Sequence, residues 1–325
     1  MNPSRKAVFF GEFARLSAAA IPVDKSLRLL MRHAPRGPLR SALRGMEAAL
    51  ASGATIAGAM APALTPLESG IIRAAEKSGQ LAAGFAHLEK WYDAQARARS
   101  AALHAMAYPL LIAHVAAIIP VILRSVSSDS PILLPLLGSL ATLWGVLLML
   151  WLLCRVILSI ARHSSLADAI ISAIPWVGSA WSRSGLARWA AVMQFHLQSG
   201  QLMSGAFEEA AAAADRPRLR KASLRLARLT ASGQPAGPAM CRESIFPEEV
   251  SLHFASAEEA GMLDVECARM ATRALHDATT AVQRAGEWIP RFVYAAALGF
   301  AAWQILRMGA GIITQQQNFM RDLGL

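Results

Sequence analysis

The sequence lacks the short motifs that mark many enzyme families. It contains no P-loop, no Gly-rich dinucleotide turn, no HExxH and no GxSxG, so the usual signs of nucleotide, zinc or acyl-transfer chemistry are missing. The three cysteines, Cys154, Cys241 and Cys267, stand too far apart for a CxxC or another close metal-ligand spacing. We therefore expect no disulfide framework, no cofactor and no enzymatic activity.

Charged residues are also scarce, at 17% of the chain against 54% hydrophobic residues. Such a balance is unusually apolar for a soluble protein of 325 residues. The net charge of +10 comes without a basic stripe interleaved with aromatic residues, so we expect no nucleic-acid partner. The first apolar stretch, residues 7–10, is too short for a signal-peptide core, and the N-terminus is expected to stay cytoplasmic.

Long uncharged runs predict membrane spans. Residues 105–123 and 133–154 carry no formal charge, and each run is long enough to cross a hydrocarbon layer of about 30 Å as a helix. A weaker third run, from Phe292 to Ile313, is interrupted by Gln304 and Arg307. These runs predict transmembrane helices at 104–124, 133–154 and 290–313, so the lipid bilayer is an expected partner.

The distribution of cations orients these spans. Residues 1–103 and 155–289 each contain 14 Lys and Arg, whereas residues 125–132 contain none. Because cationic segments stay on the cytoplasmic side, we predict cytoplasmic domains at 1–103 and 155–289. The loop 125–132 and the tail 314–325 are then expected to be periplasmic.

The two predicted cytoplasmic regions repeat each other at a nearly fixed offset. Gly53 recurs as Gly233. The run AEKSGQL, which holds Glu76, recurs as AEEAGML, which holds Glu258, at a slightly larger offset. Two small insertions account for the difference. Pro109 and Pro290 then follow at corresponding places, where the first and third spans begin, so each repeat is predicted to lead into a span.

Local signals favour helices throughout. Ala, Leu, Arg and Glu are abundant, and no sustained alternating β pattern occurs. Thr65, followed by proline and then by Glu68, forms a capping box, and this helix should end just before Gly79. Asp24 and Ser204, at equivalent positions, are expected helix N-caps. The predicted fold is an all-α membrane protein with two homologous cytoplasmic helical bundles and three transmembrane helices.

The doubled element resembles the G-E-x-S-G-x-L element of the type II secretion system F family, the GspF/PilC inner-membrane platform proteins of type II secretion and type IV pilus systems. The resemblance covers roughly residues 10–306. The matching residues are Glu76, Ser78, Gly79 and Leu81 in the first copy, and Glu258, Gly261 and Leu263 in the second. Alanine replaces the leading glycine in both copies, and Ala260 replaces the serine in the second, which indicates a divergent branch.

The resemblance implies a non-enzymatic platform in the bacterial inner membrane. Such a multi-pass protein links a hexameric cytoplasmic assembly ATPase to pilins or pseudopilins, together with other inner-membrane assembly proteins. A homo-oligomer is expected as well, since Ala113, Ala116 and Ala117 allow close packing between spans. The competing interpretations are a transporter or channel built from two repeats and a membrane enzyme that uses Glu258 or His253.

Three roles are open for Glu76 and Glu258. Each carboxylate could hold a helix junction together, contact a basic partner or, with least weight, bind a metal, for which one glutamate supplies too few oxygens. Gly53 and Gly233 are expected to close helices. Four acids of the second repeat are interpreted as solvated side chains rather than as paired catalytic carboxylates: Glu248, Glu249, Glu258 and Glu259.

Overall fold

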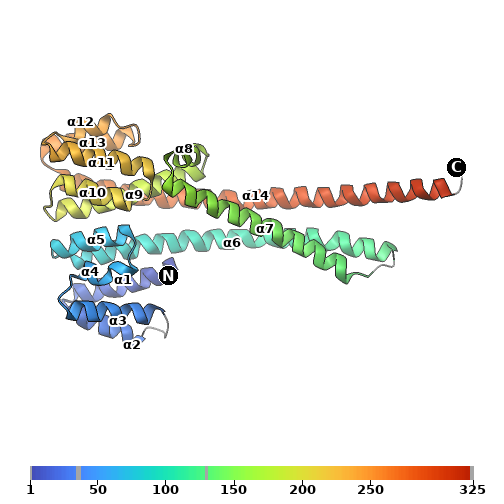
Figure 1. Ribbon diagram of the computed structural model, residues 1–325, viewed down its shortest axis with the longest axis horizontal. Coiled ribbons are helices and arrows are strands. Elements are labelled where there is room, and N and C mark those ends of the chain that lie inside the picture. Colours follow the sequence, from blue (N-terminus) through green and yellow to red (C-terminus); the bar gives the residue numbers. More distant parts are fainter. Residues whose placement is uncertain (1, 34–37, 129–130, 323–325) are drawn as a thin grey trace. The chain divides into compact units, whose positions relative to one another are not determined.

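The computed structural model describes residues 2–33, 38–128 and 131–322, and every regular element in them is a helix (Figure 1). This confirms the all-α prediction for these residues. The chain forms two compact units. Unit 1 comprises Met1–Ala98 and Ile160–Val282, and unit 2 comprises Arg99–Ser159 and Gln283–Leu325.

The internal repeat is confirmed by two series of helices in the same order. The first series is α1 (Pro3–Ala18), α2 (Val23–His33), α3 (Pro38–Ala51), α4 (Ile56–Met60), the 3-10 helix η1 (Ala61–Ala63), α5 (Pro66–Lys77) and α6 (Leu81–Ser128). The second is α9 (Val177–Gln198), α10 (Met203–Ala213), α11 (Pro217–Ala231), α12 (Ala236–Cys241), α13 (Glu248–Ala260) and α14 (Leu263–Asp322). Between them come α7 (Leu133–His163) and α8 (Ser165–Ala173).

The starting residues of corresponding helices show where the predicted insertions lie. Helix α4 begins at Ile56 and its counterpart α12 at Ala236, whereas α5 begins at Pro66 and its counterpart α13 at Glu248. The separation along the chain is larger for the second pair, so the extra residues fall in the connection after α12. Helices α2 and α3 begin and end at nearly the same offset from α10 and α11, as expected for a duplicated module, whereas α9 and α14 are longer than α1 and α6.

The capping box predicted at Thr65 is present. The Thr65 hydroxyl accepts a hydrogen bond from the Glu68 N–H, and the Glu68 carboxylate accepts one from the Thr65 N–H. Helix α5 ends at Lys77, as predicted from Gly79. The N-caps predicted at Asp24 and Ser204 are wrong, because α2 and α10 each begin one residue earlier and place these side chains inside the first turn.

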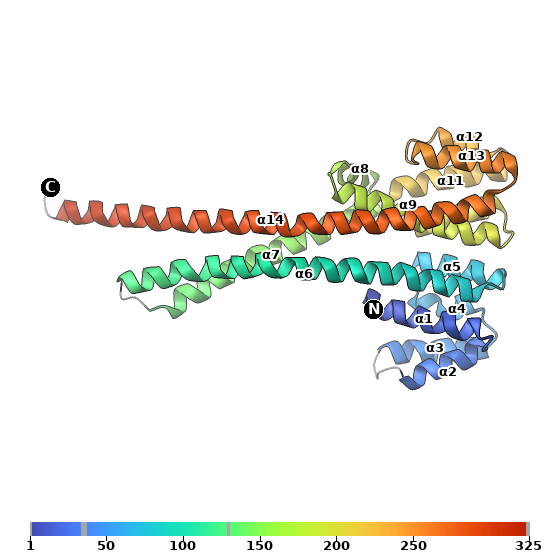
Figure 2. The same ribbon diagram turned by 180° about the vertical axis from the view of Figure 1, so that it is seen from behind.

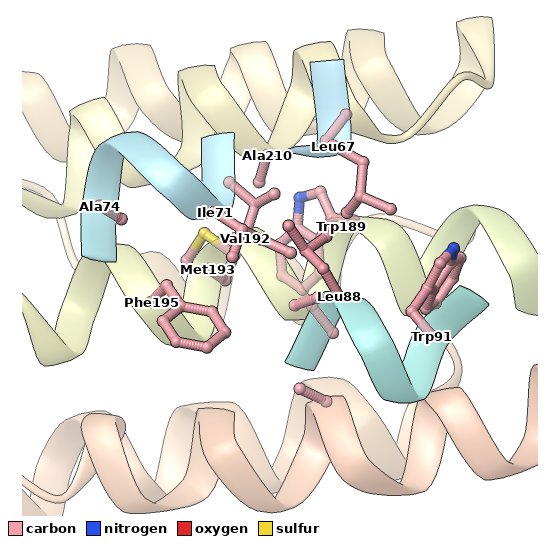
Figure 3. Packing of buried hydrophobic residues seen from close by; sticks show 14 of the residues in the cluster. Leu67, Ile71, Ala74, Leu88, Trp91, Trp189, Val192, Met193, Phe195 and Ala210 are labelled. Atoms are coloured by element: carbon pink, nitrogen blue, oxygen red, sulfur yellow. The ribbon is translucent and has the colours of Figure 1, made fainter. Parts of the chain in front are cut away.

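The core of unit 1 joins the two repeats. Helix α5 of the first repeat packs on α9 and α10 of the second, and Figure 3 shows Ile71 lying close to Val192 and Ala210 at this contact. Ile71 and Val192 are both fully buried. Each such side chain contributes about 1.5–3 kcal/mol relative to an exposed position. The two predicted domains therefore share one hydrophobic core.

Unit 2 contains the predicted spans. Two helices of the described chain, Leu81–Ile122 and Leu133–Arg162, are long and apolar enough to cross a membrane. In this unit Ala113 and Ala117 are buried with Leu143 of α7, and the Ser139 hydroxyl donates to the Ala117 carbonyl at 2.7 Å. These alanines therefore pack against α7 of the same chain, and they give no independent sign of self-association.

The third predicted span is part of α14, a single helix from Leu263 to Asp322 (Figure 2). It is not among the two helices of the described chain that qualify as membrane spans. The side chains of Gln304 and Arg307, on which this prediction depends, lie outside the described residues. The same holds for Asp129 in the predicted loop 125–132. The span at 290–313 and the two predicted periplasmic segments stay predictions.

Candidate functional site

The first copy of the motif ties the end of one helix to the start of another. Glu76 lies in the last turn of α5, and its carboxylate accepts hydrogen bonds from the Ile56 N–H at 2.6 Å and the Ala57 N–H at 3.0 Å. The Thr55 hydroxyl accepts a third, from Gly58, at 3.0 Å. The first N–H groups of a helix have no partner within the helix, and here side chains satisfy those of α4.

The second copy repeats this geometry with other residues. The Glu258 carboxylate accepts hydrogen bonds from the Ala236 N–H at 2.8 Å and the Gly237 N–H at 2.6 Å, at the start of α12. The N-cap is Pro235, which offers no side-chain acceptor. Among side chains, the start of α12 therefore depends on Glu258. In both copies a negative charge meets the positive end of a helix dipole, which is the favourable arrangement.

The motif glycines close the helices that carry the glutamates. Gly79 has φ +70° and Gly261 has φ +65°, in the left-handed region that glycine enters at no steric cost. The N–H of the residue after each glycine donates to the carbonyl of Ala75 or Ala257, at 2.8 and 2.9 Å. These are Schellman closures, and they fix where the chain leaves α5 and α13.

Gly53 and Gly233 end the helices that precede α4 and α12 at each junction. They have φ +85° and +80° and follow the ends of α3 and α11. A short connection leads from each glycine to the amide groups that Glu76 or Glu258 binds. The structure therefore brings the predicted glutamate and both glycines of each repeat into one junction, although the glutamate and the first glycine are far apart in sequence.

The remaining predicted residues divide between this junction and the long helices. The Ser78 hydroxyl donates to the Ala74 carbonyl at 3.0 Å and so belongs to the helix end. Leu81 and Leu263 are the first residues of α6 and α14 and pack at the edge of the core. Residues 109 and 290, the two prolines predicted where spans begin, lie in the interior of α6 and α14 and not at a helix start.

This geometry determines what the glutamates do within the chain. In both repeats the two carboxylate oxygens are bonded to backbone amides, so the interpretation of Glu258 as a solvated acid is wrong. Its neighbour Glu259 is exposed, as are Glu248 and Glu249. Within the described residues no group of three or more His, Cys, Asp or Glu side chains could hold a metal ion. The hydrogen bonds of Glu76 and Glu258 to backbone amides give both junctions a structural role within the chain.

Sequence reasoning missed a buried ion pair between α8 and the second repeat. Asp168 of α8 and Arg216, just before α11, have side chains 0% and 4% exposed, with Arg216 Nε 3.0 Å from Asp168 Oδ1. The Trp181 indole N–H donates to the same oxygen at 2.7 Å. Asp168 is the one acid between residues 130 and 207. That isolation in an apolar stretch is the signal that could have revealed it.

Two histidines of unit 1, the half-buried His87 and the buried His196, have lowered pKa values. His87 lies edge-on to the ring of Phe195, 5.4 Å between centroids. Burial, together with the nearby charge of Lys90, lowers the pKa of His87 to about 4. Burial also lowers the pKa of His196. Both imidazoles are therefore neutral near pH 7, which suits packing in an apolar core.

Comparison with known proteins supports the resemblance. The family described as type II secretion system (T2SS), protein F, matches residues 9–127 and again residues 189–306. These two segments cover most of the chain, and each lies within one of the two series of helices. None of the curated proteins with which the chain was compared matches it. Members of the matched family are structural platform proteins of the inner membrane, and this chain belongs to that type II secretion system protein F family.

Proposed function

We propose that this chain is a non-enzymatic inner-membrane platform. It would couple a hexameric cytoplasmic assembly ATPase to the polymerisation of pilins or pseudopilins, in contact with other inner-membrane assembly proteins. Family membership supports this class of function. In this proposal α6, α7 and α14 cross the bilayer, and unit 1 is the cytoplasmic part.

The observation that carries the proposal is the continuity of two helices. Helices α6 and α14 each begin two residues after a motif glycine and run without a break toward the predicted spans. At 1.5 Å per residue, 48 residues of α6 extend about 72 Å. A displacement imposed on unit 1 would thus reach the membrane through unbroken helices rather than through flexible linkers.

The junctions make this transmission possible. Glu76 and Glu258 hold the short helices against the helix ends from which α6 and α14 follow. In this proposal the motif contributes to partner contact by keeping the surface of unit 1 in shape, since its carboxylates are already bonded within the chain. An ATPase can drive motion only if its nucleotide states contact the platform differently.

The test uses the full chain in lipid nanodiscs and the cognate ATPase. Affinity should be measurable and should differ between the nucleotide-free, ADP and ATP-analogue states. Glu258→Ala should weaken it, whereas Glu259→Ala, at the exposed neighbour, should not. Absence of affinity in every nucleotide state would contradict the platform proposal. Substrate-specific flux by the pure chain in proteoliposomes would favour a transporter instead.

A further inference from the structure

Helix α8 has an apolar face that the described part of the chain leaves uncovered. Leu166 and Ile170 are 77% and 67% exposed, and Ile174, directly after the last turn, is 44% exposed. Residues spaced by four lie on one side of a helix, so these three side chains form a stripe. Val177, the first residue of α9, is also 44% exposed. Several large aliphatic side chains exposed together on one face of a helix mark a contact surface, whereas single exposed ones do not.

The opposite face of α8 is fixed to the rest of unit 1. The Asp168 carboxylate accepts hydrogen bonds from the Arg216 guanidinium and the Trp181 indole N–H. The Arg216 Nη2 also donates to the Ser172 hydroxyl at 3.1 Å. A side chain on Gly178 would come within 2.4 Å of the Ser172 carbonyl oxygen, so the start of α9 fits closely against α8. The helix is therefore held in one orientation, with its apolar stripe facing outward.

The chain leads into α8 directly from a predicted span. Helix α7 ends at His163 and α8 begins at Ser165, so only Ser164 separates them. The 31 residues of α7 extend about 46 Å, close to the roughly 40–45 Å thickness of a bilayer with its headgroups. Exposed apolar residues continue along α7 as far as Ile160. If α7 crosses the membrane, α8 begins at the inner headgroup layer.

Two cationic side chains lie near the start of α8. Arg162, in the last turn of α7, has a side chain 54% exposed, and its Nε lies 3.4 Å from Asp215 Oδ2 in an exposed ion pair. Lys221 Nζ lies 3.4 Å from the Ser165 hydroxyl, at the first residue of α8. Cations beside an exposed apolar face are the arrangement of helices that lie in a membrane interface, because the aliphatic side chains enter the acyl region while the cations meet anionic headgroups.

We propose that α8 is an interfacial helix. It lies in the inner headgroup layer of the bilayer that α7 crosses, with Leu166, Ile170 and Ile174 in contact with lipid. The proposal rests on the crossing of α7 and not on any partner of the platform. Through the Asp168–Arg216 pair it would fix the second repeat to the membrane surface at a point other than a span.

Nitroxide labels in the full chain can test this. The labels replace Leu166 and Ile170 as cysteines, one at a time, in a background of Cys154→Ser, Cys241→Ser and Cys267→Ala. The chain is placed in nanodiscs of zwitterionic and anionic phospholipid, and collision of each label with oxygen and with a water-soluble nickel chelate is measured. Leu202→Cys is the matched control, since Leu202 is an 81% exposed leucine elsewhere in unit 1. Leu148→Cys, in the middle of α7, reports on the span.

Labels at 166, 170 and 148 should collide more with oxygen than with nickel, and the label at 202 should show the reverse. If the label at 148 reports lipid while those at 166 and 170 behave like that at 202, α8 is not interfacial although α7 spans. Labels at 166 and 170 that are shielded from both reagents would mean a protein partner and would also overturn the proposal. If the label at 148 collides mainly with nickel, α7 does not cross the bilayer and the proposal fails with it.

Discussion

At the scale of single residues, the two motif glutamates differ in whether another side chain helps them to bind the first amide groups of a helix. At the start of α4 the Thr55 hydroxyl accepts one amide hydrogen bond beside those of Glu76. At the start of α12 the N-cap is proline, and no side-chain acceptor assists Glu258. The two copies of one motif should therefore tolerate substitution unequally.

We expect Glu258→Ala to lower the free energy of unfolding of the full chain in detergent by about 2–4 kcal/mol, since hydrogen bonds to charged groups contribute about 1.5–3 kcal/mol each. Glu76→Ala should cost less. Chemical denaturation followed by circular dichroism measures both. The control Glu259→Ala should stay within about 0.5 kcal/mol of the parent, as exposed substitutions do. Equal losses for Glu258 and Glu259 would contradict the junction role.

A second residue-scale prediction concerns Ala20. It closes α1 with φ +55°, whereas Gly200, its equivalent in the second repeat, has φ +68°. A left-handed conformation costs a residue with a Cβ about 1–2 kcal/mol. Ala20→Gly should therefore stabilise the chain by about 1 kcal/mol, measured as a higher thermal midpoint. Ala19→Gly, at an adjacent position with φ −80°, should not raise it, and a gain at both sites would argue against relief of backbone strain.

These residues also show what could be predicted from sequence. The closing glycines could be predicted, because a left-handed helix end is a local property of the backbone. The left-handed Ala20 could be inferred only from its alignment with Gly200. The amide partners of Glu76 could not be predicted, since they belong to another helix, α4, and are brought near by packing.

At the scale of elements, the helices of the repeats follow from local signals, whereas α8 does not. A helix of nine residues gives too short a pattern to separate it from its neighbours, and the sequence prediction includes its residues in one domain, 155–289. The orientation of α8 depends on Asp168 and Arg216, which are distant in sequence and meet only in the fold. Their pairing is a tertiary property.

The strength of this connection can be measured. Asp168→Ala would leave the Arg216 guanidinium buried without its carboxylate partner, and breaking a buried pair from one side costs about 3–5 kcal/mol. Asp168→Leu combined with Arg216→Met should lose much less, because neither charge remains buried. Unfolding free energies of the single and double variants form the comparison. A double variant as unstable as the single variant would show that the charges themselves are not what matters.

Helix α6 is also continuous where the sequence predicts a boundary between a domain and a span. The sequence predicts a cytoplasmic domain to residue 103 and a separate span from residue 104, with Pro109 near the boundary. The structure has one helix across this point, with Pro109 and Pro120 inside it. Proline removes one backbone donor, and helices in membranes tolerate this where neighbouring groups compensate. A proline in an apolar run is therefore a weak sign of a helix boundary.

At the scale of the whole molecule, the two repeats share one core in unit 1. The duplication could be read from sequence, but the packing of α5 on α9 could not. It depends on side chains such as Ile71 and Val192, whose apolar character is common to every helix of the module. The number of spans is likewise a property of the whole chain, because each crossing moves all that follows to the other side.

The location of the C-terminus follows from this count. With three crossings and a cytoplasmic N-terminus, the tail 314–325 is periplasmic. Alkaline phosphatase fused after residue 325 should then be active, and a fluorescent protein fused there should stay dark. Fusions after residues 130 and 233 serve as controls, since the same topology places the first in the periplasm and the second in the cytoplasm. A fluorescent C-terminal fusion with both controls as expected would mean that α14 does not cross, and that Arg307 keeps this helix on the cationic, cytoplasmic side.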